Sequence, residues 1–456
     1  MKDQSARGLA EFCASLKYED IPAQVVEKAK HLVLDILRLS VVGSRLPWGE
    51  CTYKVFRQIG GKEESTAIGF GERLPAIHAA YINGVTSHGL ENDDTHAGAI
   101  LHPGVAVVPT VLAVAEREGA GGRQLLTAMI AGYEVMIRVG IAMQPSLLND
   151  RGFHSTSVCG HFGAAAGAAN LMGLSVDETV NAIALAAAYA SGLANWLSGG
   201  MIKSIHAGKA AKAGIEAALL AAAGVTGPRQ IFEGKFGFCN AYANHYDLDA
   251  ITEGLGKKWR TLEIHLKPHA TTRNIQSAIE ATAIIASKHN IHPVDVTSVE
   301  VRTSPGLLAE FETSATPVDV IEAQSSFPFA IATALFKGGA RVLKEFVLFE
   351  DLKKAIGNRE VQSLAQRVQV RQDPAFAWEK FASEVSIRLK DGKVHTQRVD
   401  VMRGSPDNPF TKQEVRDRYL SQASSVIDRE RLSKAAEAID RLEDVKKIEE
   451  ITSLLR

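Results

Sequence analysis

The feature that most constrains the fold is a predicted helix after Ser175 whose second half is entirely apolar. Ser175 and Glu178 have the spacing of a capping box, in which each side chain satisfies a backbone N–H of the other residue. Every residue from Ala182 to Ala188 is Ala, Ile or Leu. A helix that is apolar on every side must be buried, so the chain has to build a helical core around it.

Helical patterns continue through the first 262 residues. They cover residues 21–42, 104–118 and about 206–223, and the last one ends at Gly224 before Thr226-Gly-Pro228. Runs of small residues at 163–167 and 217–223 allow helices to approach closely. We therefore predict a tight helical core, or a helical interface between subunits.

After about residue 263, the spacing of apolar residues changes from the helical pattern to include alternation at every second residue. Residues 297–303 and 383–389 alternate between apolar and polar, as strands do. Asp391 and Gly392 then form a turn signal before 394–401, which predicts a hairpin. Helical patterns occur between these strands at 274–288 and 326–337, and again from Thr411 to an amphipathic end at 445–455. We predict a mainly α protein with a large all-helical domain (1–262 plus 402–456) and an α+β domain (263–401).

Composition excludes several classes of function. The net charge is -1 over 456 residues and no basic stripe stands out, which argues against nucleic-acid binding. No apolar run reaches the roughly 18 residues of a membrane span, and residues 1–7 lack a signal core, so a cytoplasmic location is expected. The four cysteines are widely spaced, which argues against disulfides, a zinc ribbon or an iron–sulfur dehydratase.

Chemistry concentrates where histidines and carboxylates gather. Seven of the 14 histidines fall in one helical region, at positions 78, 88, 96, 102, 154, 161 and 206. Glu91, Asp93 and Asp94 would repel one another unless protons, a metal or cations intervene. His102 stands before a Pro-Gly at a helix start, where backbone N–H groups favour anions.

Three further stretches add bases and cations. His154 follows Gly152 and Phe153 ahead of a helix of small residues, and Lys203 and His206 stand three residues apart. Lys267 and Arg273 lie where the helical region meets the predicted α+β unit, and clefts often form at such junctions. Cations suit a polyanionic substrate, and elimination needs both a base and an acid. These residues define a substrate class better than they define a reaction.

In order and spacing, these stretches resemble the MmgE/PrpD (2-methylcitrate dehydratase) family. The run from Glu91 to Thr95, the His102-Pro-Gly triplet, Gly152-Phe-His154 and the segment from Lys203 to Gly208 are similar to family motifs. So are Thr226-Gly-Pro, Phe232-Glu-Gly234, the segment from Lys267 to Arg273 and the helix start at Phe327-Pro-Phe329.

The resemblance implies a helical domain built from both chain ends, an inserted α+β lid, a homodimer, and no metal or organic cofactor. The activities it implies are 2-methylcitrate dehydration, cis-aconitate decarboxylation and iminodisuccinate epimerisation. The implied catalytic residues are Asp93, Thr95, His102, His154 and Lys203. The implied substrate-binding residues are Glu91, His206, Lys267, Arg273 and Gln276.

This chain departs from the family pattern at a few positions. Glu91 replaces a first Asp, and Thr271 and Thr272 replace a cysteine pair. Gln276 stands near the place of a histidine, and Phe329 stands in place of a tyrosine. All of these changes fall at the expected substrate end of the pocket.

We therefore expect a cofactor-independent lyase of the dehydratase type that acts on a small di- or tricarboxylate. A decarboxylase or an epimerase on a related polycarboxylate is the alternative. A metal-dependent hydrolase is a second rival, with its ligands drawn from His88, Asp93, Asp94, His96 and His102. A polycarboxylate sensor without catalysis is a third, although His102, His154 and Lys203 argue against it.

Overall fold

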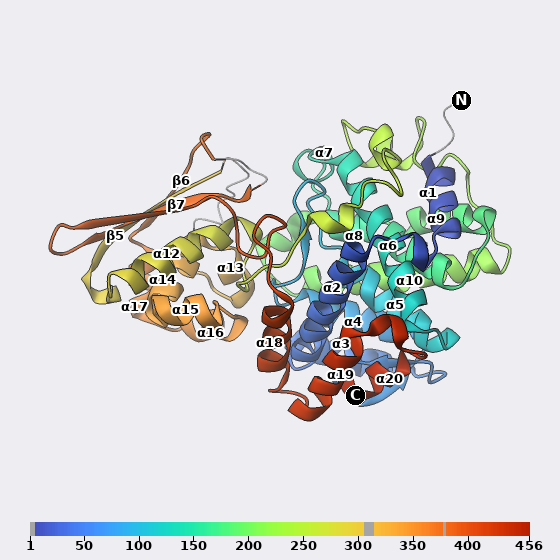
Figure 1. The fold of residues 1–456 in the computed structure, drawn as a ribbon. Helices are drawn as coiled ribbons and strands as arrows, with labels where there is room; N and C mark the ends of the chain where they lie inside the picture. Colours follow the sequence, from blue (N-terminus) through green and yellow to red (C-terminus); the bar gives the residue numbers. More distant parts are fainter. Residues whose placement is uncertain (1–4, 305–313, 377–379) are drawn as a thin grey trace.

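Two buried hydrophobic clusters organise the chain in a computed structural model, which describes residues 5–304, 314–376 and 380–456 (Figure 1). The larger cluster draws on the first 270 residues and on 410–455. The smaller cluster draws on residues between Ile275 and Val399. The first four residues of the N-terminal segment discussed above lie outside the described part.

The larger domain is centred on five packed helices. They are α4 (Ala76–His88), α5 (Gly104–Glu118), α6 (Gly122–Met143), α8 (Ser155–Leu171) and α10 (Ile202–Ala222). Glycine makes the closest approach possible, because a Cβ on Gly163 would lie 2.8 Å from the Gly132 carbonyl oxygen and 2.5 Å from the Met136 Cβ. The α8 helix is buried along almost its whole length, so it occupies the central place expected for the helix after Ser175.

The other α-helices of this domain cover that centre. They are α1 (Ser5–Ser15), α2 (Ala23–Gly43), α3 (Pro47–Ile59), α7 (Ser146–Asn149), α9 (Val176–Tyr189), α11 (Phe238–Tyr242), α18 (Lys412–Ala423), α19 (Arg429–Asp440) and α20 (Glu449–Thr452). The capping box of α9 is present, with the Glu178 N–H donating to Ser175 Oγ. The expectation that α9 is buried on every side is wrong, because Ala188 is exposed and Leu185 and Ala187 are half-buried.

The helical domain also contains two short sheets, so the prediction of an all-helical domain is wrong in that detail. Strands β1 (Ser65–Ala67) and β2 (Glu72–Leu74) form a hairpin. Strands β3 (Thr95–His96) and β4 (Ile264–His265) pair antiparallel, with Thr95 opposite His265. The second pair joins residues about 170 positions apart and positions the site described below.

The smaller domain is a mixed four-stranded sheet in the order β6-β5-β7-β8. The strands are β5 (Val296–Thr303), β6 (Val368–Gln372), β7 (Ser383–Leu389) and β8 (Val394–Val399). The hairpin predicted at Asp391 and Gly392 joins β7 to β8. The α-helices of the smaller domain are α12 (Gln276–Lys288), α13 (Val320–Ser325), α14 (Phe327–Lys337), α15 (Gly339–Glu345), α16 (Phe349–Ala355) and α17 (Arg359–Ala365). Figure 1 shows them gathered below the sheet, while α18 returns to pack on α2.

Among the residues that the structure describes, one helix, α6, is long and apolar enough to cross a membrane, but 94% of its most apolar stretch is buried within the protein. That burial is typical of a core helix.

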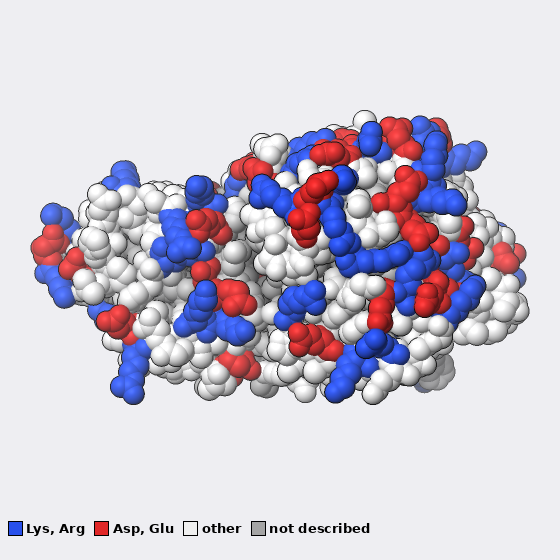
Figure 2. All heavy atoms as spheres, turned by 90° about the horizontal axis from the view of Figure 1, so that it is seen from below, with Lys and Arg blue, Asp and Glu red and all other residues white. Residues whose placement is uncertain are grey.

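On the face shown in Figure 2, acidic and basic side chains lie next to one another.

Replacing Gly163 with Ala should lower the free energy of unfolding by about 1–3 kcal/mol, because the new methyl group overlaps Met136 and the Gly132 backbone. Gly357→Ala is the control, since nothing lies within 4 Å of its added Cβ. Denaturant unfolding monitored by circular dichroism measures both. Equal stabilities of the two variants would contradict the packing described here.

We also predict a homodimer. The family resemblance and the runs of small residues predict it, and the large apolar side chains of Leu193, Met201 and Ile202 are exposed and would be available to a partner chain. Sedimentation velocity at micromolar concentration should give the mass of two 49.0-kDa chains. A single-chain mass would refute the prediction.

Candidate active site

The β3–β4 pair brings an acidic loop against a lysine. The loop from Glu91 to Asp94 runs directly into β3, and Lys267 follows β4. Lys267 Nζ lies 2.9 Å from Glu91 Oε1 and 3.3 Å from Asp93 Oδ1, and all three side chains are buried. The Lys267 ammonium group is therefore fully enclosed and carries two carboxylates as counter-charges.

Two histidines hold the other oxygen of Asp93. His88 Nδ1, at the end of α4, lies 2.8 Å from Asp93 Oδ2, and His102 Nδ1 lies 3.3 Å from the same oxygen. His102 Nδ1 also contacts the Asp94 carbonyl at 2.8 Å. Burial raises the pKa of Asp93, but His102, Lys267 and His88 outweigh that effect and hold it well below its usual value. Asp93 is thus a carboxylate.

Because both rings direct Nδ1 at acceptors, Nδ1 carries the proton and Nε2 has the free lone pair. Burial lowers the pKa of His88 to about 3 and that of His102 to about 4, although Asp93 opposes both shifts. Both rings are therefore neutral at pH 7. His88 is fully buried, whereas the His102 side chain keeps 15% exposure. Of the two, His102 is the ring that a ligand can reach.

A second histidine pair adjoins the first. His154 precedes α8 as its N-cap residue, and its Nδ1 lies 2.9 Å from the Nδ1 of His206 on α10. The rings of His154 and His88 stack at 5.7 Å. Burial and the neighbouring histidines lower the pKa of His154, and burial lowers that of His206 to about 4. Four neutral imidazoles thus form one continuous group.

Lys203 supplies the second cation. The predicted helix begins earlier than expected, at Ile202, so Lys203 stands in its first turn and not ahead of it. Its Nζ contacts the Glu91 carboxylate and lies 4.6 Å from the centre of the Trp196 ring. Burial, and then the charge of Lys267, lower the pKa of Lys203 well below its usual value, whereas the adjacent Glu91 carboxylate favours the charged form.

Glu91 is the carboxylate shared by the two lysines. Its φ of +53° lies in the left-handed region, which a residue with a side chain rarely adopts. Such strain persists only where surrounding contacts enforce it, and it is frequent at functional sites. Lys203 and Lys267 supply those contacts here.

Asp94 resolves the predicted repulsion within the loop. Its Oδ1 accepts from the Gly104 N–H at the start of α5, and its Oδ2 accepts from the Tyr133 hydroxyl. Burial and the adjacent Asp93 charge raise the pKa of Asp94 to about 8. Asp94 is therefore mostly uncharged at pH 7, and it anchors the loop on α5 and α6.

The remaining predicted residues have other surroundings. Thr95 Oγ1 donates to the Leu101 carbonyl at 3.4 Å. Arg273 lies against the Phe381 ring at 5.3 Å, and its charge adds to the effect of burial in lowering the pKa of His102. The Gln276 amide is engaged by the backbone of the 269–272 loop, so the structure favours a role in holding that loop over binding substrate. Phe329 packs in the smaller core.

Sequence reasoning missed the residues behind the site. Asn92 Nδ2 donates to the Lys267 carbonyl at 2.7 Å, and Arg418 Nη2 donates to the same oxygen at 2.7 Å. Arg38 Nη2 donates to the Asn92 carbonyl at 3.3 Å. Arg418 lies 151 residues from Lys267, on α18, and no local motif marks it. The sequence places His88 in the histidine-rich region and among the possible metal ligands, but it does not predict the contact of His88 with Asp93.

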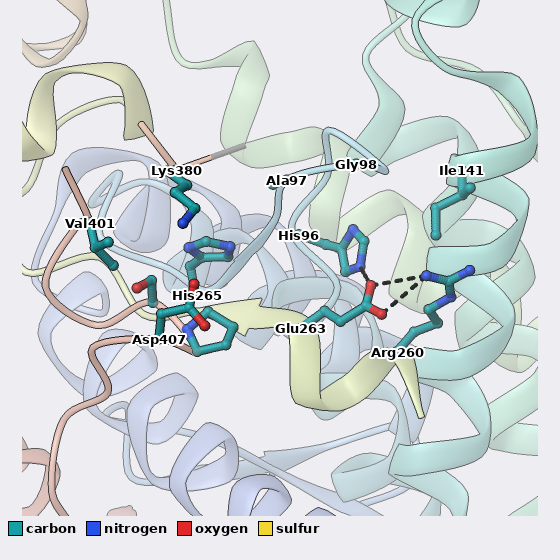
Figure 3. A pocket seen from close by; sticks show the side chains of 12 residues that line it. His96, Ala97, Gly98, Ile141, Arg260, Glu263, His265, Lys380, Val401 and Asp407 are labelled. Atoms are coloured by element: carbon teal, nitrogen blue, oxygen red, sulfur yellow. Dashed lines mark hydrogen bonds and ion pairs between the residues drawn. The ribbon is translucent and has the colours of Figure 1, made fainter. Parts of the chain in front are cut away.

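A separate pocket of about 390 Å³ is lined by His96 of β3, by His265 of β4 and by Arg260, Glu263 and Lys380 (Figure 3). His96 Nε2 lies 3.0 Å from Glu263 Oε2, and Arg260 binds the same carboxylate. His96 thus points away from Asp93, and the five ligands of the metal-hydrolase alternative do not converge. Among the described residues, no group of three or more His, Cys, Asp or Glu side chains could hold a metal ion.

Comparison with known families decides the relationship. Residues 7–251 match the MmgE/PrpD N-terminal domain, and residues 269–444 match the MmgE/PrpD C-terminal domain. The chain belongs to the MmgE/PrpD family. Its C-terminal family region includes α18 and α19, even though α18 packs on α2 of the larger domain.

Curated MmgE/PrpD relatives align over almost the whole chain. The cis-aconitate decarboxylase-like protein oryM of Aspergillus oryzae is 30% identical over 98% of this chain and 96% of its own length. Cis-aconitate decarboxylase of Aspergillus terreus is 27% identical over 97% and 94%. Human cis-aconitate decarboxylase is 27% identical over 97% and 92%.

The pKa of Asp94 gives a prediction for stability. The unfolded chain loses this proton near pH 4 and the folded chain only near pH 8. As the pH rises between these values, the contribution of Asp94 should therefore lower the free energy of unfolding by about 1.4 kcal/mol per pH unit. Asp94→Asn, which cannot ionise, should lack this component. Urea unfolding of both proteins at pH 5, 6 and 7 measures it, and identical pH slopes would contradict the assignment.

Proposed function

We propose that this chain is a lyase that removes one carboxylate from a small, unsaturated tricarboxylate of the cis-aconitate kind. The observation that carries the proposal is the pair of buried lysines, Lys203 and Lys267, held by Glu91 beside a group of neutral histidines. The dehydratase expected from the sequence uses the same groups. The names of the relatives support the decarboxylase alternative better.

Substrate binding would use the lysines. A substrate carboxylate can replace Glu91 on Lys203 or Lys267, because both ammonium groups already bind a carboxylate there. Charge-assisted hydrogen bonds of this kind are among the strongest available, and burial keeps water from weakening them. Arg273, on the side of the smaller domain, would bind a further carboxylate.

Decarboxylation breaks the bond between a carbon and its carboxylate. The electron pair shifts through the neighbouring double bond, and the carbon at its far end takes up a proton. His102 is the proposed proton donor: with the anionic substrate beside it, the neutral ring would take up a solvent proton on Nε2 while Asp93 at Nδ1 stabilises the resulting imidazolium, and Nε2 would then pass that proton to the carbon. The His102 side chain is partly accessible to solvent. Solvent would supply the proton for the next turnover.

A substrate panel tests the proposal. Purified protein, with and without EDTA, is incubated with cis-aconitate, 2-methylcitrate, citrate and iminodisuccinate, and the products are followed by NMR in deuterated water. Release of CO₂ from cis-aconitate, with one deuterium entering the product, is expected. Turnover of 2-methylcitrate to an alkene, or activity that requires an added divalent ion, would reject the decarboxylase proposal.

Substitutions separate the roles within the site. His154→Ala and Lys203→Ala should each lower kcat by roughly 10²–10⁴, whereas Arg273→Ala should mainly raise KM because it removes uniform binding. Lys434→Ala, on the exposed face of α19, is the control and should match the parent protein. Near-normal kcat in both His154→Ala and Lys203→Ala would show that the catalytic group is elsewhere.

A further inference from the structure

A large cavity adjoins the loop of the candidate active site, and Leu90 and Asn92 of that loop form part of its lining. Its volume is about 810 Å³, and it lies where α2 and α18 of the larger domain face α15 and α16 of the smaller one. Its inner end is formed by Arg38, Asn92 and Arg418, and its walls include Leu46, Phe346 and Phe349. The cavity therefore combines a cationic end with apolar walls.

Arg418 has unused hydrogen-bonding capacity at that inner end. The residue is 5% exposed, and its Nη2 donates to the Lys267 carbonyl and to Asn92 Oδ1. Its Nε and Nη1 are buried and have no hydrogen-bond partner among the residues the structure describes. The guanidinium lies against the rings of Phe346 and Phe410. A buried donor without an acceptor is costly, and an incoming acceptor removes that cost.

The charges at the inner end do not balance. Arg38 forms an ion pair with Asp35 at 2.8 Å, while Arg418 Nη1 stands 3.9 Å from the same Asp35 oxygen, too far for a hydrogen bond. One carboxylate thus serves two guanidinium groups. Burial, followed by the charge of Arg38, lowers the pKa of Arg418 to about 9, which still leaves it a cation at neutral pH.

Acidic residues lie farther out along the cavity. Glu414 is bound by Arg403, Glu345 by Arg341, and Asp417 accepts from Gln413. Glu350 is exposed. These side chains disfavour a ligand with several negative charges, but they do not obstruct a single anionic group that reaches Arg418 ahead of an apolar body.

We propose that this cavity binds a small molecule with one carboxylate and an apolar body, with one carboxylate oxygen accepting a hydrogen bond from Arg418 Nε. Val42, Leu46, Leu90 and Phe349 would cover the apolar part. The proposal does not depend on the reaction at the active site. Because Arg418 also holds the Lys267 carbonyl, an occupant would share one side chain with that site.

Decanoate is the probe, and isothermal titration calorimetry is the measurement. Decanol and decyltrimethylammonium have the same chain with a neutral and a cationic head. We expect saturable binding of decanoate, weaker binding of decanol, and none of the cation. Arg418→Gln should weaken decanoate about 10- to 100-fold, the worth of a charge-assisted hydrogen bond, and leave decanol unchanged.

Two further variants complete the test. Arg416→Gln, on the same helix, changes a guanidinium that pairs with Glu437 and Asp440, and it should bind decanoate as the parent does. Val42→Trp fills the apolar part while leaving Arg418 intact, and it should abolish binding of both decanoate and decanol. If Arg418→Gln does not fold, the Val42→Trp variant and the comparison of decanoate, decanol and decyltrimethylammonium still test the proposal.

The proposal is overturned if the parent protein shows no saturable binding of decanoate, or if it binds the cation as tightly. It is equally overturned if folded Arg418→Gln or folded Val42→Trp binds decanoate with unchanged affinity. Thermal unfolding of each variant establishes that it is folded.

Discussion

The structure depends on how two buried lysines are neutralised. An ammonium group taken out of water costs several kcal/mol unless carboxylates and hydrogen bonds compensate it. Lys267 has Glu91 and Asp93, and Lys203 shares Glu91. This requirement explains why the chain accepts a left-handed backbone at Glu91 and places the carboxylates of Glu91 and Asp93 two residues apart.

The same requirement extends outward to residues that never touch the lysine side chains. Asp93 is held by two histidines, and Asp94 is removed from the charge balance by its raised pKa. Asn92 and Arg418 fix the Lys267 carbonyl, so the α18 helix of the C-terminal segment supports the site from behind. The antiparallel contact of β3 with β4 brings all these groups together, and only two residues of each strand form it.

Electrostatic preorganisation follows from this arrangement. Cations and neutral imidazoles stand side by side in a dry setting, where charge interactions are stronger than in water. A polyanion that displaces Glu91 keeps the lysines neutralised and adds its own charge beside histidines that can gain a proton. The smaller domain contributes Arg273 from the end that precedes α12. Under the proposed function, this side chain would link the position of the smaller domain to substrate binding.

Local pattern was enough to predict much of this protein. The limits of α5 and β7, the capping box of Ser175 and the hairpin at Asp391 depend on neighbours within a few residues, and the structure contains them all. The sequence also indicated the loop from Glu91 to Asp94 and the cations Lys203 and Lys267 that now meet. It could not determine that His96 turns toward Glu263, that Gln276 braces its own loop, that α8 and not α9 is fully enclosed, or that Arg418 supports Lys267. Those outcomes depend on contacts between residues far apart in the chain, because burial and hydrogen-bond partners are decided only when distant elements pack together.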